Sequence, residues 1–148
     1  MDHVAFIRPE PLAQLVSGKK AFEVRLGKRR TCVWDCSKGD RVLIKESMSE
    51  IKYATEITEV HRFTDLVPED ISALRDLLGT DSPFEAAYWN RKTDATRCIA
   101  IRVADFVSVS FPHDLTPRGV QVGWVSGFEH FDQMRPKPRA SSLFGFPL

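Results

Sequence analysis

The sequence has little cysteine: three residues in 148, at Cys32, Cys36 and Cys98. An odd number of cysteines in a chain of this length argues against a disulfide framework and favours a reducing, cytoplasmic compartment. Cys32 and Cys36 have the C-x-x-x-C spacing of half a zinc site, but the four histidines are scattered and supply no second half. We therefore expect small, partly buried thiols, with no metal and no cofactor.

An excess of charge of either sign is also lacking, since 21 Lys and Arg face 20 Asp and Glu and the net charge is +1. A bulk field that attracts polyanions is thereby excluded, and any affinity for nucleic acid must come from a local patch. No apolar run approaches the roughly 20 residues that cross a bilayer. Residues 1–11 also lack the basic and then apolar pattern of a signal peptide. No membrane association is expected.

The apolar content, 43% of residues, is sufficient for a core of ordinary size. The length favours one domain, which we place at residues 1–134. Residues 135–148 form a C-terminal tail that is basic and then apolar, and we expect its apolar end to dock on its own domain or on a protein partner.

Periodicity and turn residues predict a β-α-β-β-β-α-α-β-β order. Strands and helices do not alternate, so a doubly wound parallel sheet is disfavoured. We predict an α+β fold, with a small, mostly antiparallel curved sheet or barrel and short helices at its openings. The expected strands cover 3–7, 21–26, 41–45, 52–63, 96–111 with a bend near Ala104–Asp105, and 120–131; the expected helices cover 11–18, 67–79 and 82–90.

A strand-like stretch near the N-terminus, SGKKAFEVRLGKRR at residues 17–30, carries a dense cluster of basic side chains around a single acid, Glu23. Its apolar residues Phe22, Val24 and Leu26 recur with period two, which places Glu23 and Arg25 together on the opposite face of a strand. This pattern has two interpretations. The charges form a solvated surface ion pair, or they converge on a ligand.

The same stretch resembles the signature of the ASCH domain family, a branch of the PUA-like β-barrels. The family pattern G-x-K-x-x-E-x-R is complete here as Gly18, Lys20, Glu23 and Arg25. A second mark, a Gly-Asp turn before an apolar strand, is matched at residues 39–47. A third, an aromatic helix before a strand that ends near a proline, is matched at residues 84–112. The resemblance spans roughly residues 4–112.

The resemblance implies that the protein binds RNA or a modified nucleotide in a charged cleft. Gly18 would end a helix and bring Lys20 to the cleft, where Lys20 would hold a phosphate. Glu23 would accept a hydrogen bond from a base amino group, and Arg25 would grip a phosphate or a base edge. Ser47 and Ser49, after the third strand, would lie near the same opening.

Two further groups are candidates for the same ligand. Lys28, Arg29 and Arg30 follow a glycine and would either contact a nucleic-acid backbone or form a solvated loop. Tyr88 and Trp89 would either stack on an unpaired base or belong to the core. Tyr88 is the better stacking candidate of the two.

An enzymatic alternative stays open. Amidohydrolases of the ASCH family that act on acetylated cytidine share the lysine at Lys20, but they carry a threonine where this chain has Glu23, and their catalytic glutamate lies on a later element. Other members are linked to ribonuclease activity, for which Lys20 and Glu23 would serve as acid and base. A third alternative is a coactivator-like interaction module that contacts a protein partner through the tail.

Overall fold

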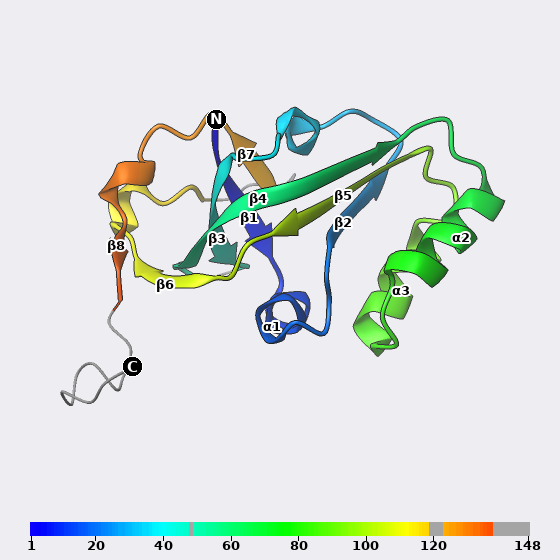
Figure 1. The fold of residues 1–148 in the computed structure, drawn as a ribbon, viewed down its shortest axis with the longest axis horizontal. Helices are drawn as coiled ribbons and strands as arrows, with labels where there is room; N and C mark the ends of the chain where they lie inside the picture. The colour runs from blue at the N-terminus through cyan, green and yellow to red at the C-terminus, as the bar shows by residue number, and fades with distance from the viewer. Residues whose placement is uncertain (48, 119–122, 138–148) are drawn as a thin grey trace.

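The structure, a computed structural model, describes residues 1–47, 49–118 and 123–137. The sheet and its helices fill these ranges, with three short 3₁₀ turns between them (Figure 1). The strands are β1 (Asp2–Ile7), β2 (Glu23–Gly27), β3 (Arg41–Glu46), β4 (Ile51–Phe63), β5 (Arg97–Val103), β6 (Val107–Ser110), β7 (Trp124–Ser126) and β8 (Arg135–Pro136). The helices are α1 (Pro9–Ser17), α2 (Pro68–Leu78) and α3 (Pro83–Arg91).

The main path of the sheet has the order β2-β5-β4-β3-β1-β7, with β6 and β8 branching from β4. Every strand pair is antiparallel except β1 with β3, which the excursion through α1 and β2 connects in parallel. The sheet curls on itself, so that its two end strands, β2 and β7, approach each other without pairing (Figure 1). The predicted α+β fold with a mostly antiparallel curved sheet is confirmed.

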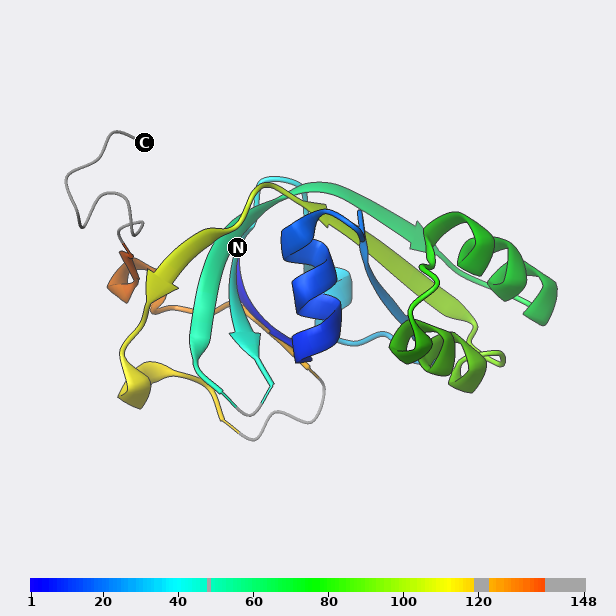
Figure 2. The ribbon, with the colours of Figure 1, turned by 90° about the horizontal axis from the view of Figure 1, so that it is seen from below.

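Helix α1 lies across the sheet, as Figure 2 shows from below, and α2 and α3 gather beyond the end of β4. Leu12 and Leu15 of α1 are buried in the main core. Ile71 and Leu74 of α2 and Trp89 of α3 pack on β2 and β5 in a second core. The helices therefore cover the sheet and at the same time frame the gap beside β2. None of the helices described is long and apolar enough to cross a membrane.

The sequence patterns locate most elements to within a few residues. Val24 and Leu26 are buried while Glu23 and Arg25 are only half-buried, as the alternation predicted. Phe22, which was expected on the buried face, is also half-buried, because it lies just before the start of β2. The expected bend near Ala104–Asp105 is the break between β5 and β6. Of the proposed tail, residues 135–136 pair with β6 as β8, and residues 138–148 lie outside the described residues.

Candidate functional site

A cavity of about 930 Å³ opens at the gap between β2 and the other end of the curled sheet. Its volume lies in the range of about 300–1,000 Å³ that is usual for small-ligand sites. Lining residues come from β1, α1, β2, β3 and α3 and from the segments beside them. They are Phe6, Ile7, Arg8, Pro9, Pro11, Lys20, Glu23, Val24, Arg25, Lys45, Ser47, Phe84, Glu85, Tyr88, Arg91, Lys92 and Gly123.

Lys20 reaches the cavity through the turn that ends α1. Gly18 adopts a left-handed conformation with φ +82°, and its N–H donates to the carbonyl of Leu15, as expected of a helix C-cap. The N–H of Lys20 then donates to Gln14, which folds the chain back against the helix. Gly18 itself does not line the cavity, so its role is to direct the chain.

The ammonium group of Lys20 is buried against a carboxylate that the sequence analysis did not single out. Its Nζ lies 3.3 Å from Oε2 of Glu85, and both side chains are more than nine-tenths buried. Thr80 also donates to Oε2 of Glu85, and the indole N–H of Trp89 donates to Oε1 at 3.4 Å. Ser82 caps α3 by accepting from the N–H of Glu85, a contact that the local pattern of a serine three residues before a glutamate favours. That pattern locates the residue on the helix, but not its contact with Lys20.

Arg25 joins the two ends of the curled sheet. From β2, its two terminal nitrogens donate to the carbonyls of Phe6, 3.1 Å away in β1, and of Gly123, 3.3 Å away just before β7. Its Nε donates to Oε1 of Glu23 at 3.1 Å, and its guanidinium lies over the ring of Trp124. Protein acceptors therefore occupy three of its N–H directions. Arg25 also lines the cavity, so its contact with a ligand stays a prediction beside this bridging role.

The carboxylate of Glu23 is only partly paired among the described residues. Its Oε1 is held by Arg25, but Oε2 is buried and has no donor among the described residues. A buried acceptor without a donor costs about 1–3 kcal/mol, and more for a charged group. Glu23 is at the same time one of the residues that line the cavity.

The two adjacent aromatic residues of α3, Tyr88 and Trp89, lie in different surroundings. Tyr88 lines the cavity, and its hydroxyl accepts from the N–H of Leu26 at 2.9 Å, which caps the free edge of β2. Burial raises the pKa of Tyr88 to about 12 despite the opposing effect of that N–H. Trp89 is 1% exposed in the core. Of the two alternatives for Trp89, its burial fits the core, because the next position on a helix turns by about 100° and faces the sheet.

The basic loop after β2 does not reach the cavity. Lys28 pairs with Asp94 and Arg30 with Asp35, each at 2.8 Å and among exposed side chains. Arg29 is exposed and does not line the cavity. The strand carries the chain away from Glu23 at about 3.3 Å per residue, so this loop lies at the far end of β2. The solvated interpretation fits these positions.

Lys45 enters the cavity through an irregularity in the sheet. The register of β3 against β4 shifts between Ile44 and Lys45, and such bulges re-aim side chains. Lys45 is buried, donates to the carbonyl of Pro117 at 3.0 Å and lies over the ring of Phe6. Ser47 also lines the cavity, whereas Ser49 does not.

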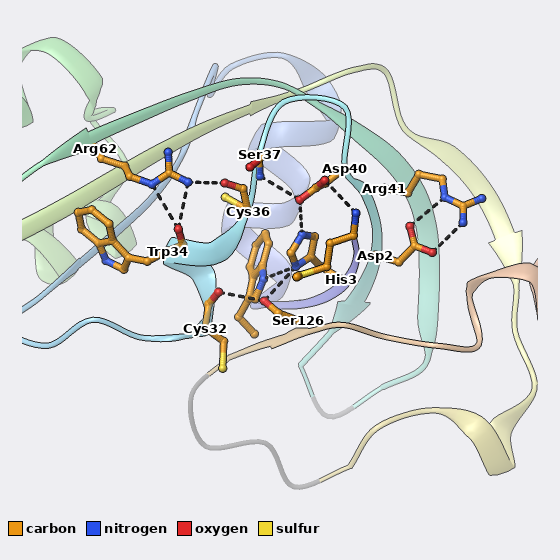
Figure 3. A network of polar contacts seen from close by, with 12 residues as sticks. Asp2, His3, Cys32, Trp34, Cys36, Ser37, Asp40, Arg41, Arg62 and Ser126 are labelled. Carbon is orange, nitrogen blue, oxygen red and sulfur yellow. Dashed lines mark hydrogen bonds and ion pairs between the residues drawn. The ribbon is translucent and has the colours of Figure 1, made fainter.

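A second polar cluster surrounds His3 near the start of β1 (Figure 3), whereas the cavity is lined by Phe6 and Ile7 at the end of that strand. His3 is fully buried, with Nε2 2.8 Å from Oδ2 of Asp40 and Nδ1 3.0 Å from the hydroxyl of Ser126. The indole of Trp124 donates to Nδ1 at 3.2 Å, so Nε2 carries the proton and donates to Asp40. Burial by itself would raise the pKa of Asp40, but the hydrogen bonds from His3 and from the Ser37 N–H outweigh it and lower that pKa.

This Ser-His-Asp set is not arranged for nucleophilic catalysis. The nitrogen that would take the proton of Ser126 already accepts from Trp124, and Ser126 donates to the carbonyl of Cys32 at 2.9 Å. None of the three residues lines the cavity. The cluster instead explains the Gly-Asp mark: Gly39 turns the chain with φ +93°, and Asp40 then ties β3 to β1 through His3.

Three of the solved structures that resemble this chain are of the ASCH protein of Zymomonas mobilis. A tyrosine-to-phenylalanine variant is 13% identical over 97% of this chain and 94% of that chain, with a TM-score of 0.56. The unmodified protein is 12% identical over 96% and 91%, with a TM-score of 0.55. A serine-to-alanine variant is 15% identical over 73% and 70%, with a TM-score of 0.54. No protein-family model matches the sequence, and no curated protein does so.

Sequence identities of 12–15% support a shared fold and nothing finer. The sequence motifs and the structure of this chain point to the same fold. The G-x-K-x-x-E-x-R signature, the Gly-Asp turn and the curled mixed sheet occur together in this chain. The chain has the ASCH fold.

Proposed function

We propose that this protein binds RNA or a modified nucleotide, with one base inserted in the cavity beside β2. The observation that carries the proposal is the buried Oε2 of Glu23, an acceptor with no donor among the described residues, on the wall of a cavity of ligand size. Bases present amino and ring N–H groups on their edges, and a carboxylate accepts from these. The bound base would supply the hydrogen bond that Glu23 lacks.

The neighbouring side chains suit the faces of such a base. Tyr88 and Phe84 line the same cavity, and stacking of a base on an aromatic ring contributes about 1–3 kcal/mol. Arg25 fixes the carboxylate of Glu23 through Oε1 and is itself held by the two backbone carbonyls across the gap. Glu23 is therefore oriented before the ligand arrives, which lowers the cost of ordering it on binding.

The test is a panel of nucleosides, nucleotides and short RNAs, including acetylated and methylated bases, with affinities measured by calorimetry and products analysed in the same samples. At least one ligand is expected to bind, and Glu23→Gln should weaken it about tenfold, because a hydrogen bond to a charged acceptor becomes one to a neutral acceptor. Lys28→Gln, outside the cavity, is the matched control and should change affinity less than twofold. Equal affinities of Glu23→Gln and the unmodified protein would contradict the proposal.

A second candidate function, hydrolysis of the bound nucleotide, is favoured by the buried pair of Lys20 and Glu85. The pair lies on the cavity wall together with Glu23, so an amine and two carboxylates face one space. Groups of this kind transfer protons in hydrolases. Glu23 in place of the threonine of the related amidohydrolases changes the mechanism that such a reaction would use, so binding without turnover remains our first proposal.

Turnover separates the two candidates. If the protein is a hydrolase, Lys20→Ala should lower the rate about 100-fold or more while it weakens binding far less, since a proton-transfer group acts mainly in the transition state. If it only binds, none of the panel ligands yields product. In that case Lys20→Ala reduces affinity alone.

A further inference from the structure

The cationic side chains that line the cavity fall into two groups with different surroundings. Lys20, Arg25 and Lys45 lie deep, and each has a protein acceptor: Glu85, Glu23 with two carbonyls, and the carbonyl of Pro117, respectively. Arg8, Arg91 and Lys92 line the outer part and are exposed or half-buried. None of these three makes an ion pair with a carboxylate in the part of the chain that the structure describes.

Aromatic rings hold two of the outer cations over the cavity wall. The guanidinium of Arg8 lies 5.7 Å from the ring centre of Phe84, and the ammonium of Lys92 lies 5.8 Å from that of Tyr88. A cation–π contact fixes the position of the charge without using its N–H donors. The donors of both side chains remain available to a ligand that enters the cavity.

The lining of the cavity carries an excess of positive charge. Among the described residues, six cationic side chains and two carboxylates line the cavity, and both carboxylates belong to the deep group, where Lys20 and Arg25 already pair with them. The outer group therefore has uncompensated positive charge at a concave mouth, which concentrates the field. The chain as a whole has a net charge of only +1, so this field is local.

We propose that Arg8, Arg91 and Lys92 form an anion subsite that binds the phosphate of a nucleotide whose base lies against Glu23 and Tyr88. The subsite lies outside the G-x-K-x-x-E-x-R signature and makes the ligand a phosphate ester of a nucleoside rather than a neutral nucleoside. The part of this inference that concerns the base rests on the proposed function. The anion subsite itself does not depend on it. Arginine and lysine supply the forked and the point-like donors that phosphate oxygens accept.

The experiment compares nucleosides with their 5′- and 3′-monophosphates and with dinucleoside monophosphates, by calorimetry at low and moderate salt. Inorganic phosphate and pyrophosphate are probed alone by thermal shift. The monophosphates are expected to bind about tenfold or more tightly than the nucleosides, with an advantage that shrinks as salt screens the charges. A gain for the dinucleoside monophosphates as well would identify a phosphodiester in an RNA strand as the source, and a gain for the monoesters alone would identify a terminal phosphate.

The variant Arg8→Gln/Arg91→Gln/Lys92→Gln should remove the advantage of the phosphate to within about twofold and leave nucleoside affinity unchanged. Arg91→Gln alone, at an exposed position in the last turn of α3, should remove part of the advantage of the phosphate. This single variant replaces the triple variant if the triple variant is unstable. Lys28→Gln/Arg30→Gln is the control of matched chemistry outside the cavity and should keep the full advantage.

The outcomes separate the two proposals. Nucleosides that bind as tightly as their phosphates, or an advantage that survives the triple variant, would overturn the anion subsite and leave the proposed function standing. Stabilisation by pyrophosphate that disappears in the triple variant, with no binding of any nucleoside or nucleotide, would support the anion subsite and overturn the proposed function. No response to any probe would overturn both.

Discussion

Two buried polar clusters lie toward the two ends of β1, and they differ in how fully their atoms are paired. Around His3, both ring nitrogens, the carboxylate of Asp40 and the hydroxyl of Ser126 have partners within the protein. Around Glu23, the carboxylate has one oxygen bound by Arg25 and one without a donor. Both clusters lie next to Trp124, which donates to His3 on one side and supports Arg25 on the other.

The difference separates a structural cluster from a binding site. A fully paired buried network contributes to the stability of the fold, because hydrogen bonds are stronger in the interior of low dielectric constant and reinforce one another. A buried acceptor without a donor lowers stability and is retained where a ligand completes it. A mutation in the His3 cluster should therefore lower the stability of the fold, and a mutation at Glu23 should lower the affinity for a ligand.

The largest expected effect is the loss of stability when the His3 network is broken. His3→Ala leaves a cavity, removes one of the hydrogen bonds of Asp40 and leaves the indole N–H of Trp124 without its partner, and should destabilise the fold by about 3 kcal/mol. For a chain of this length the melting temperature should fall by about 6–12 °C. Thermal denaturation measures the change, with nucleotide affinity below the transition expected to stay within twofold. A melting temperature that does not change would show that the network is not structural.

The next effect concerns the bridge between the two ends of the sheet. A Cβ on Gly123 would lie 2.7 Å from a terminal nitrogen of Arg25, and the residue has φ +72°. Gly127 has a similar φ, +69°, with nothing within 4 Å of its Cβ position, so Gly127→Ala is the matched control for backbone strain. The control should cost about 1 kcal/mol and Gly123→Ala about 2 kcal/mol. Only Gly123→Ala should also weaken nucleotide binding, because it displaces Arg25 from Glu23.

Alkaline pH tests the burial of the cavity wall at Tyr88. The folded pKa, about 12, lies above the ordinary value of 10. The unfolded chain therefore loses this proton first as pH rises, and stability falls between about pH 10 and pH 12. Absorbance titration should show one tyrosine ionising late, and Tyr88→Phe should remove that late step. A late step that survives in Tyr88→Phe would assign it to Tyr53 instead.

The smallest effect concerns the reactivity of the three cysteine thiols and leaves both clusters intact. Cys36 and Cys98 are fully buried, and burial raises their pKa values to about 11 and about 12, whereas Cys32 is exposed. A thiol reagent should therefore modify one cysteine in the native protein and three after denaturation. Mass spectrometry of the native product should locate the label on Cys32, and Cys32→Ser should abolish it. Rapid labelling of Cys98 would mean that the second core opens readily.

The sequence is informative about local structure and less so about contacts between distant elements. The alternation around Glu23, the cap at Gly18 and the Ser82 start of α3 are local patterns, and each predicts its element. The acceptors of Arg25 lie 19 and 98 residues away in the chain and are backbone carbonyls, which no residue type reveals. For this reason the sequence predicted a ligand contact for Arg25 but not its bridge between β1 and the residue before β7.

The outer cations illustrate the same limit. Arg8 precedes α1 and Arg91 ends α3, and only the packing of the two helices brings them to one cavity mouth. The more conspicuous run, Lys28 to Arg30, is contiguous in sequence but lies at the far end of β2. Density of charge along the chain was therefore a poorer guide to the cavity than the direction of the strand that precedes it.

The central claim, that an incompletely paired Glu23 marks the binding site, is tested most directly by measuring stability and nucleotide affinity together for Glu23→Gln and His3→Ala. The account predicts that Glu23→Gln keeps its stability to within about 1 kcal/mol and loses about tenfold in affinity. His3→Ala should lose stability and keep its affinity. Affinity that is unchanged in Glu23→Gln, for a nucleotide that the unmodified protein binds, would contradict the account.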